Sequence, residues 1–300
     1  MEKSKQSLIY AGLAILFWAT IPTAFKIALA EAPLLPLLTI ASFTAVLALL
    51  VIMLVTGKLP LLRLTTRADL LNSALLGLIN PFVYYLILLK AYQLLPAQVA
   101  QPLNMIWPIV LVFLSVPLLK QKISTSSYLS LFISFAGVYL ISSQGKPFST
   151  GHASLTGVAL ATGSSLFWAL YFILNIRDRR DEAVKLLTNF AFASIYLLTA
   201  SLITGSSLAT VSLKGVLSSV YVGVFEMGLT FWLWLMAMRL APSNDKIGNL
   251  VYLTPFISLV FVHFILHEPV YYTTPAGLIL IIGGIVYQNR RKAPAVSKSR

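Results

Sequence analysis

Residues 77–119 read GLINPFVYYLILLKAYQLLPAQVAQPLNMIWPIVLVFLSVPLL, two long apolar runs joined by a short Leu-Leu-Pro connection. A related pattern returns at residues 223–266, GVFEMGLTFWLWLMAMRLAPSNDKIGNLVYLTPFISLVFVHFIL, in which Pro255 corresponds to Pro108. A transmembrane helix needs about 20 predominantly apolar residues, and each run is close to that length. We therefore predict a duplicated set of membrane-spanning helices.

The composition excludes ordinary soluble folds. Apolar residues make up 58% of the 300 residues and charged residues only 10%, whereas about 25% charged residues is usual in soluble domains. The apolar residues form blocks separated by short polar links, which is the pattern of an all-α membrane protein. Cysteine is absent and the three histidines do not cluster with acidic residues, so we expect no metal centre and no cofactor.

The apolar blocks predict ten transmembrane helices. The first block is too long for a signal peptide and has no small-residue cleavage site, so we expect it to remain as the first helix. The approximate ranges are 8–27, 36–56, 70–91, 97–119, 126–143, 155–175, 187–205, 214–238, 246–266 and 272–289.

Basic residues predict the orientation of the chain. With the N-terminus in the cytoplasm, 18 of the 22 lysines and arginines fall in the termini and the cytoplasmic links. Both termini are therefore expected to be cytoplasmic. The sequence predicts a multi-pass membrane protein, with the bilayer and a small-molecule substrate as partners, no nucleic acid, and a monomeric state. Four basic residues fall at the outer ends, and we expect the first two to snorkel: Lys26, Lys90, Lys146 and Lys214.

Short motifs extend the duplication over the chain. LFWATIP at 16–22 resembles LFWALYF at 166–172, and Gly137 corresponds to Gly284. Helices 1, 3, 4 and 5 thereby pair with helices 6, 8, 9 and 10. Because five helices form each unit, the units must be inverted in the membrane. The predicted domains are residues 1–145 and 152–292, followed by a basic cytoplasmic tail at 293–300.

Inverted repeats are typical of secondary transporters that bind their substrate near the membrane midplane. Two alternatives remain at this point: a duplication without functional meaning, or a channel. We expect Gly137, Gly283 and Gly284 to permit close helix approach. The basic segment RDRRDEAVK at 177–185 is expected to be a solvated loop.

Three motifs resemble those of a known family. Asn104-Met105-Ile106-Trp107-Pro108 resembles the Asn-x-x-Trp-Pro motif of YddG-type aromatic amino acid exporters. Phe167-Trp168-Ala169 and Tyr252-x-Thr254-Pro255 resemble its counterparts in the second half. Nearly the whole chain is thus similar to EamA-type transporters of the drug/metabolite transporter superfamily. The resemblance implies a ten-helix inner-membrane exporter whose central cavity is lined by helices 1, 3, 4, 6, 8 and 9. It also implies a Glu after the fourth helix of each half, where this sequence has Gln121 and Glu268.

Glu226 lies near the middle of the eighth predicted helix. A carboxylate at this depth costs about 2.5–3.5 kcal/mol, so it should face the bundle interior. It could couple a proton or bind a substrate amino group, or it could be a protonated Glu that joins two helices. Its counterpart in the first half is Asn80, so an amide and a carboxyl are expected at equivalent depths.

Residues four apart lie on the same face of a helix, so Asn80 and Glu226 each predict further residues on their own face. The predicted faces of the third and eighth helices carry Asn80 and Tyr84, and Glu226, Thr230 and Trp234. The same spacing directs two other residues toward lipid or the membrane interface: Tyr85 and Trp232.

The remaining candidates for the cavity are polar or aromatic residues inside predicted helices. The tryptophans could stack on an aromatic or cationic substrate, or they could simply pack between helices. These candidates are Trp18, Gln101, Asn104, Trp107, Trp168, Tyr171, Asn249 and Tyr252. A proline within a helix leaves the carbonyl four residues earlier without its hydrogen bond, which predicts a kink. The alternative is that these are ordinary membrane-helix prolines, whose free carbonyls are satisfied by neighbouring groups. The four predicted kinks are at Pro22, Pro81, Pro108 and Pro255.

Nucleotide-binding, serine-hydrolase and zinc-protease motifs are absent from the sequence, so we do not expect an enzyme. The sequence predicts a secondary transporter that exports small metabolites by alternating access, with amino acids, especially aromatic ones, as the expected substrates. The alternatives are efflux of cationic drugs or other metabolites, a facilitator or channel, and, from another class, a membrane-embedded enzyme.

Overall fold

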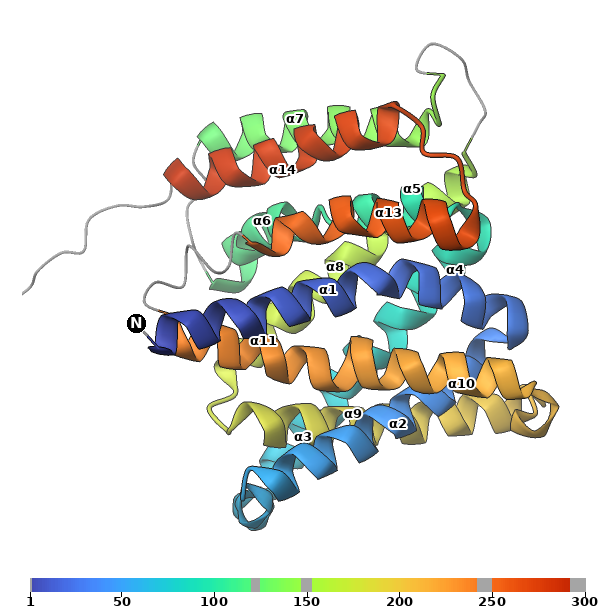
Figure 1. The fold of residues 1–300 in the computed structure, drawn as a ribbon. Coiled ribbons are helices and arrows are strands. Elements are labelled where there is room, and N and C mark those ends of the chain that lie inside the picture. The colour runs from blue at the N-terminus through green and yellow to red at the C-terminus, as the bar shows by residue number, and fades with distance from the viewer. Residues whose placement is uncertain (1, 120–124, 147–152, 242–249, 292–300) are drawn as a thin grey trace, which may run out of the picture.

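The computed structural model describes residues 2–119, 125–146, 153–241 and 250–291, in which all regular structure is helical (Figure 1). Seven helices are long and apolar enough to cross a membrane, and three shorter apolar helices lie at Tyr128–Ser142, Val251–Leu266 and Thr273–Tyr287. These ten segments lie where the ten spans are predicted. The count of ten membrane crossings stays a prediction.

The helices of the two halves follow the same order. The first half contains α1 (Glu2–Glu31), α2 (Leu34–Val55), η1 (Leu59–Leu64), α3 (Arg67–Gly77), η2 (Leu78–Val83), α4 (Tyr84–Leu94), α5 (Ala97–Asn104), α6 (Trp107–Leu119) and α7 (Thr125–Ser142). The second half contains α8 (Leu155–Arg177), α9 (Glu182–Ile203), η3 (Leu208–Thr210), α10 (Leu213–Val222), η4 (Gly223–Gly228), α11 (Leu229–Leu240), η5 (Val251–Leu253), α13 (Thr254–Leu266) and α14 (Thr273–Arg291).

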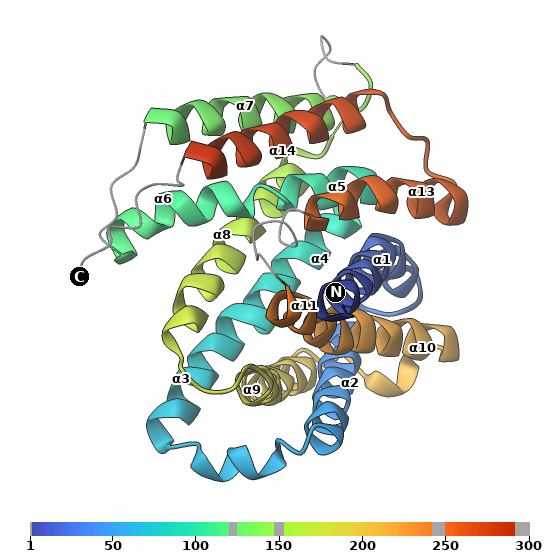
Figure 2. The ribbon, with the colours of Figure 1, turned by 60° about the vertical axis from the view of Figure 1, so that its left-hand side comes forward.

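Corresponding helices make corresponding contacts. Helix α1 of the first half packs on α10, α11 and α13 of the second half. Its counterpart α8 in the second half packs on α4, α5 and α6 of the first half. Two pairs of counterparts pack directly on each other: α2 with α9, and α7 with α14. Figures 1 and 2 both show the α7–α14 pair at one edge of the bundle and α2 and α9 near the opposite edge. This exchange of partners is the arrangement expected of two units related by a pseudo-twofold axis.

The glycines between α7 and α14 show that these helices are antiparallel. A Cβ on Gly137 would lie 2.5 Å from the carbonyl oxygen of Gly277, and a Cβ on Gly277 would lie 2.5 Å from the carbonyl oxygen of Gly137. Gly284, further along α14, lies against Ser134, which is earlier in α7. The predicted close approach is confirmed for Gly137 and Gly284. It is wrong for Gly283, which has no atom within 4 Å of its Cβ position.

Another pair of glycines marks the repeat inside the bundle. Gly77 lies against the carbonyl oxygen of Asn189 in α9, and Gly223 lies against the carbonyl oxygen of Ala41 in α2. In each case an added Cβ would be 2.3 Å from the oxygen. Only a residue without a Cβ permits this approach. The segment η2 begins directly after Gly77 and η4 begins at Gly223, so the two segments occupy equivalent places.

Two charged side chains tie helix ends together at the end of the bundle that holds the α4–α5 connection. Lys26 donates hydrogen bonds to the carbonyl oxygens of Tyr92 at 2.9 Å and Leu95 at 3.1 Å, where α4 ends. Glu268 accepts a hydrogen bond from the backbone N–H of Ala97 at 3.0 Å, where α5 begins. A cation at a helix C-terminus and an anion at an N-terminus both complement the helix dipole. The predicted snorkelling of Lys26 is therefore wrong, because its ammonium group satisfies free carbonyls.

The segment at 177–185 forms an ionic network, and the prediction of a solvated loop is wrong. Asp178 pairs with Arg180 at 2.5 Å and accepts a hydrogen bond from Asn72 at 3.2 Å. Arg180 also donates to Ser73 at 2.7 Å. These contacts join the end of α8 to α3, because the repeat brings both helix ends to the same side of the bundle.

Further along the same segment, Lys185 is only 2% exposed. It donates to Glu182 at 2.5 Å and to the carbonyl oxygen of Asp178 at 3.2 Å. Asp181 pairs with Lys58 at 2.7 Å. A buried charge is tolerated when it is paired and hydrogen-bonded, so this segment anchors the start of α9 to the end of α2.

Asp178→Asn should lower thermal stability by about 1–3 kcal/mol at neutral pH, because it removes the charge that holds Arg180. Burial raises the pKa of Asp178, but the hydrogen bonds from Arg180 and the positive charges of Arg180 and Lys185 together outweigh burial and hold the pKa below its usual value. A carboxyl with a lowered folded pKa stabilises the protein above its unfolded pKa of about 3.9 and loses this contribution as the pH falls through the folded value.

The Asp178→Asn prediction is checked by melting parent and variant in detergent between about pH 3 and pH 8, and the gap between their Tm values should shrink below about pH 4. A difference in Tm that does not change with pH would show that the charge of Asp178 is not the cause of the lower stability.

Candidate functional site

The third helix of each half changes to π-helix at the same place. The first π segment, η2, contains Asn80, and the second, η4, contains Glu226. Asn80 has a non-helical backbone conformation, φ −147° and ψ 121°. Short π segments are rare and are frequent at functional sites. The two residues that the repeat pairs thus both lie where the third helix of each half departs from regular α-helix.

A π turn inserts one residue into a helix and changes which later side chains share a face. Regular spacing of four from Glu226 therefore does not hold across η4. Thr230, predicted to line the cavity, is fully buried and donates its hydroxyl to the carbonyl oxygen of Phe225 within the π segment. Phe231 instead faces the centre, with its ring 5.9 Å from that of Trp168. Phe231 was missed by the helical spacing.

Tyr85 lies in the site, so its predicted position toward lipid or the interface is wrong. Its hydroxyl donates a hydrogen bond to Oε1 of Glu226 at 2.9 Å, and its side chain is fully buried. Tyr85 is five residues after Asn80, just as Phe231 is five residues after Glu226. In the first half the backbone is kinked at Asn80, and in the second half a π-helical segment contains Glu226, so regular helical spacing fails in both. A tyrosine of the first half thereby holds the carboxyl group of the second half.

A chain of polar contacts continues from this pair. Tyr84 lies beside Tyr85, with ring centroids 4.8 Å apart, and donates its hydroxyl to Oδ1 of Asn104 at 3.2 Å. Asn104 in turn donates to the hydroxyl of Ser164 in α8 at 2.7 Å. The structure therefore brings together Tyr84, Asn104 and Glu226, which were predicted as cavity residues on three different helices.

The predicted aromatic residues form one cluster that includes side chains of both halves. The ring of Trp168 lies 5.1 Å from Tyr84, 6.2 Å from Tyr171 and 6.4 Å from Trp107. On the other side, Trp18 lies 5.6 Å from Phe231 and 5.5 Å from Trp234. The repeat-related Trp18 and Trp168 are thus joined through Phe231. Several members are half-buried: Trp18, Trp107, Trp168 and Trp234, together with Asn104 and Glu226.

Other predicted residues lie around this centre. Gln101 accepts a hydrogen bond from Ser258 in α13. Tyr171 accepts one from Asn189 at 3.3 Å. Asn80 is 2% exposed, and its Oδ1 has no hydrogen-bond partner among the described residues. Tyr252 packs against the main core from η5, and Asn249 lies outside the described residues.

The four prolines differ in their surroundings. Pro81 lies within η2, Pro108 follows the break between α5 and α6, and Pro255 stands at the start of α13. By contrast, α1 continues through Pro22. Three of the four prolines thus accompany a change of helix, which brings irregular backbone close to the central residues.

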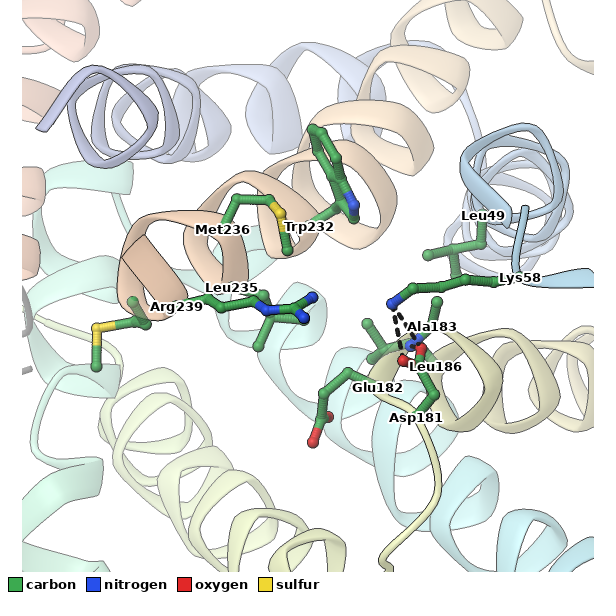
Figure 3. A pocket seen from close by; sticks show the side chains of 11 residues that line it. Leu49, Lys58, Asp181, Glu182, Ala183, Leu186, Trp232, Leu235, Met236 and Arg239 are labelled. Atoms are coloured by element: carbon green, nitrogen blue, oxygen red, sulfur yellow. Dashed lines mark hydrogen bonds and ion pairs between the residues drawn. The ribbon is translucent and has the colours of Figure 1, made fainter. Parts of the chain in front are cut away.

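Two cavities lie outside the central cluster. One, of about 310 Å³, lies between α2, α9 and α11 and is lined by Lys58, Asp181 and Arg239 among others (Figure 3). The other, of about 640 Å³, lies beside α3 and the end of α8 and includes Arg177 and Arg179. Neither cavity is lined by the predicted central residues, whose rings pack against one another.

The comparisons with known proteins agree with this repeated architecture. The EamA-like transporter family matches residues 5–143 and, a second time, residues 155–289. The uncharacterized transporter YvbV of Bacillus subtilis (strain 168) is 29% identical over 297 residues, which are 97% of this chain and 93% of that protein. An uncharacterized transporter of Archaeoglobus fulgidus is 28% identical over 170 residues, 55% of this chain and 58% of that protein.

A crystal structure at 19% sequence identity shares the fold, with a TM-score of 0.67 over 96% of this chain and 99% of the other. Both halves of the sequence match one family separately, and they are also the two halves that exchange contacts in the structure. The protein is therefore a membrane protein of the EamA-like transporter family.

Proposed function

We propose that this protein is a secondary transporter of a bacterial inner membrane that exports small metabolites by alternating access. Its substrates are amino acids, aromatic ones preferred. The observation that carries the proposal is the convergence of repeat-related side chains of both halves on one cluster around Glu226 and Trp168. In inverted-repeat transporters, substrates bind near the midplane where the repeats meet.

The proposed topology has ten spans and two inverted units, with both termini in the cytoplasm. The antiparallel packing of α7 on α14 supports inversion, because these helices occupy corresponding positions in the two units. The excess of basic residues in the links on the N-terminal side supports the orientation. The proposed units are residues 1–145 and 152–292, and the separate family matches at 5–143 and 155–289 support a division between them.

The chemistry of the cluster suits a zwitterion with an aromatic side chain. Glu226 is half-buried and can receive a substrate ammonium group or a proton. The rings of Trp168, Phe231 and Tyr84 can separate and stack on an aromatic substrate, since aromatic rings prefer offset or edge contacts at about 4.5–7 Å between centroids. A single carboxyl beside tryptophans also suits organic cations, so cationic compounds belong in the same test.

Counterflow in proteoliposomes tests this proposal. Liposomes loaded with unlabelled phenylalanine, tyrosine or tryptophan should accumulate the labelled amino acid with saturable kinetics, whereas liposomes loaded with glutamate or glucose should not. Trp168→Ala should lower the flux about tenfold or more, because the variant loses the stacking surface.

Phe132→Ala is the matched control, since Phe132 is 71% exposed on the outside of the bundle, and it should transport normally. Size-exclusion profiles check that both variants fold. Saturable flux of organic cations alone would overturn the choice of amino acids, and flux that never saturates for any compound would indicate a channel.

A further inference from the structure

The cavity between α2, α9 and α11 combines an apolar wall with a charged one. Its apolar wall includes Leu49, Leu186, Trp232, Leu235 and Met236. Its volume of about 310 Å³ is at the lower end of the range for small-molecule sites, roughly 300–1,000 Å³. Both halves of the chain contribute to it, α2 from the first and α9 and α11 from the second.

The charged wall has one positive charge that no described residue neutralises. Asp181 pairs with Lys58 at 2.7 Å, and Glu182 pairs with the buried Lys185 at 2.5 Å. Both carboxylates of the cavity are therefore already compensated. Arg239 is exposed, and Figure 3 shows its guanidinium group directed from α11 toward the Lys58–Asp181 pair. It makes no ion pair or hydrogen bond with any residue in the described part of the chain.

This distribution of charge selects the class of ligand. The planar guanidinium group of arginine binds carboxylates through two parallel hydrogen bonds. Trp232 and Met236 stand on the same helix as Arg239, and both side chains border the cavity (Figure 3). An organic cation would meet an excess of positive charge, and an inorganic anion would leave the apolar wall uncovered. A small carboxylate with an apolar or aromatic part matches both walls.

We propose that this cavity is a binding site for small amphipathic carboxylates, in which Arg239 binds the carboxylate and Trp232 and Met236 contact the apolar part. Its role as a loading site for transport rests on the proposed function, whereas binding itself does not. The helix α11 connects the cavity with the centre, because Trp234, two residues after Trp232, contacts Trp18 of the central cluster at 5.5 Å.

Two probes of similar size separate the carboxylate from the apolar part. The first is 3-phenylpropionate, which has a carboxylate and no amine, and the second is 2-phenylethylamine, which has the reverse. We expect the full-length protein in lipid nanodiscs to bind 3-phenylpropionate saturably in equilibrium dialysis. Arg239→Gln should weaken this binding about tenfold or more, and Arg239→Lys should weaken it less. The amine should not displace the carboxylate.

Arg63→Gln is the matched control, because Arg63 is an exposed arginine in η1 that does not line the cavity. It should bind 3-phenylpropionate like the parent. Unchanged binding by Arg239→Gln with an unchanged Tm, or equal displacement by 2-phenylethylamine, would overturn the inference.

The loading site and the proposed function can fail separately. If 3-phenylpropionate binding depends on Arg239 but the protein shows no amino acid counterflow, the binding site is supported and the proposed function is rejected. If counterflow is normal but the protein does not bind 3-phenylpropionate, the proposed function is supported and the binding site is rejected.

Discussion

Glu226→Gln should lower counterflow about tenfold or more and make the remaining flux nearly independent of pH. Glutamine keeps the size of the side chain and can still accept the hydrogen bond from Tyr85, which is 2.9 Å in the structure. It loses the negative charge and the proton that a carboxyl group can exchange. A hydrogen bond to a charged group is worth about 1.5–3 kcal/mol, which corresponds to roughly ten- to hundredfold in rate or affinity. The measurement is counterflow between about pH 5.5 and pH 8.5.

Two variants control for the charge and the hydrogen bond. Tyr85→Phe removes the hydroxyl but retains the ring, which packs on Tyr84 and Phe25, so we expect a smaller loss and a flux that still depends on pH. Glu31→Gln removes a carboxyl from the ion pair with Lys214 near the helix ends, and it should leave the pH profile unchanged. If Glu226→Gln transports like the parent at every pH, Glu226 has no part in the mechanism.

Gly77→Ala and Gly223→Ala should each destabilise the fold by about 1–3 kcal/mol or more. The added methyl carbon would lie 2.3 Å from a backbone carbonyl oxygen of the neighbouring helix in both variants. Backbone cannot move aside as a flexible side chain can, so α3 must shift from α9, or η4 from α2. The Tm in detergent and the monodisperse fraction after purification measure the effect.

Gly12→Ala is the matched control for these two glycines. It also replaces a helical glycine, but its Cβ position has no atom within 4 Å. Alanine is the better helix former by roughly 0.5–1 kcal/mol, so this variant should be as stable as the parent or more stable. Equal losses of Tm in Gly12→Ala and Gly223→Ala would show that the close packing is not what makes glycine necessary.

Helix positions could be read from the sequence because apolar runs of bilayer length are a local signal. The predicted ranges 36–56 and 155–175 agree closely with α2 and α8. Ends outside the apolar runs agree less well. The helix predicted at 187–205 begins at Glu182, because Asp181 accepts a hydrogen bond from the backbone N–H of Ala183 at 3.0 Å and caps a polar first turn.

The candidate site was found in part for the same reason. Asn104, Trp168 and Glu226 are polar or aromatic residues deep inside apolar runs, which marks them whatever their exact orientation. Phe231 carries no such mark, because phenylalanine is ordinary in a membrane helix. Tyr85 was assigned to the wrong face because spacing assumes an uninterrupted α-helix, whereas the helix is kinked at Asn80, whose backbone is non-helical.

Composition, apolar periodicity and internal repetition were enough to predict a duplicated helical membrane protein, because each of these signals depends on the order of residues along the chain. Only the tertiary structure showed three features: the interrupted helices at η2 and η4, the hydrogen bond from Tyr85 to Glu226, and the burial of Lys185. They depend on groups far apart in sequence, such as Gly223 against the carbonyl of Ala41. Contacts between neighbouring helices, which the order of residues does not show, determine where the backbone departs from the regular α-helix.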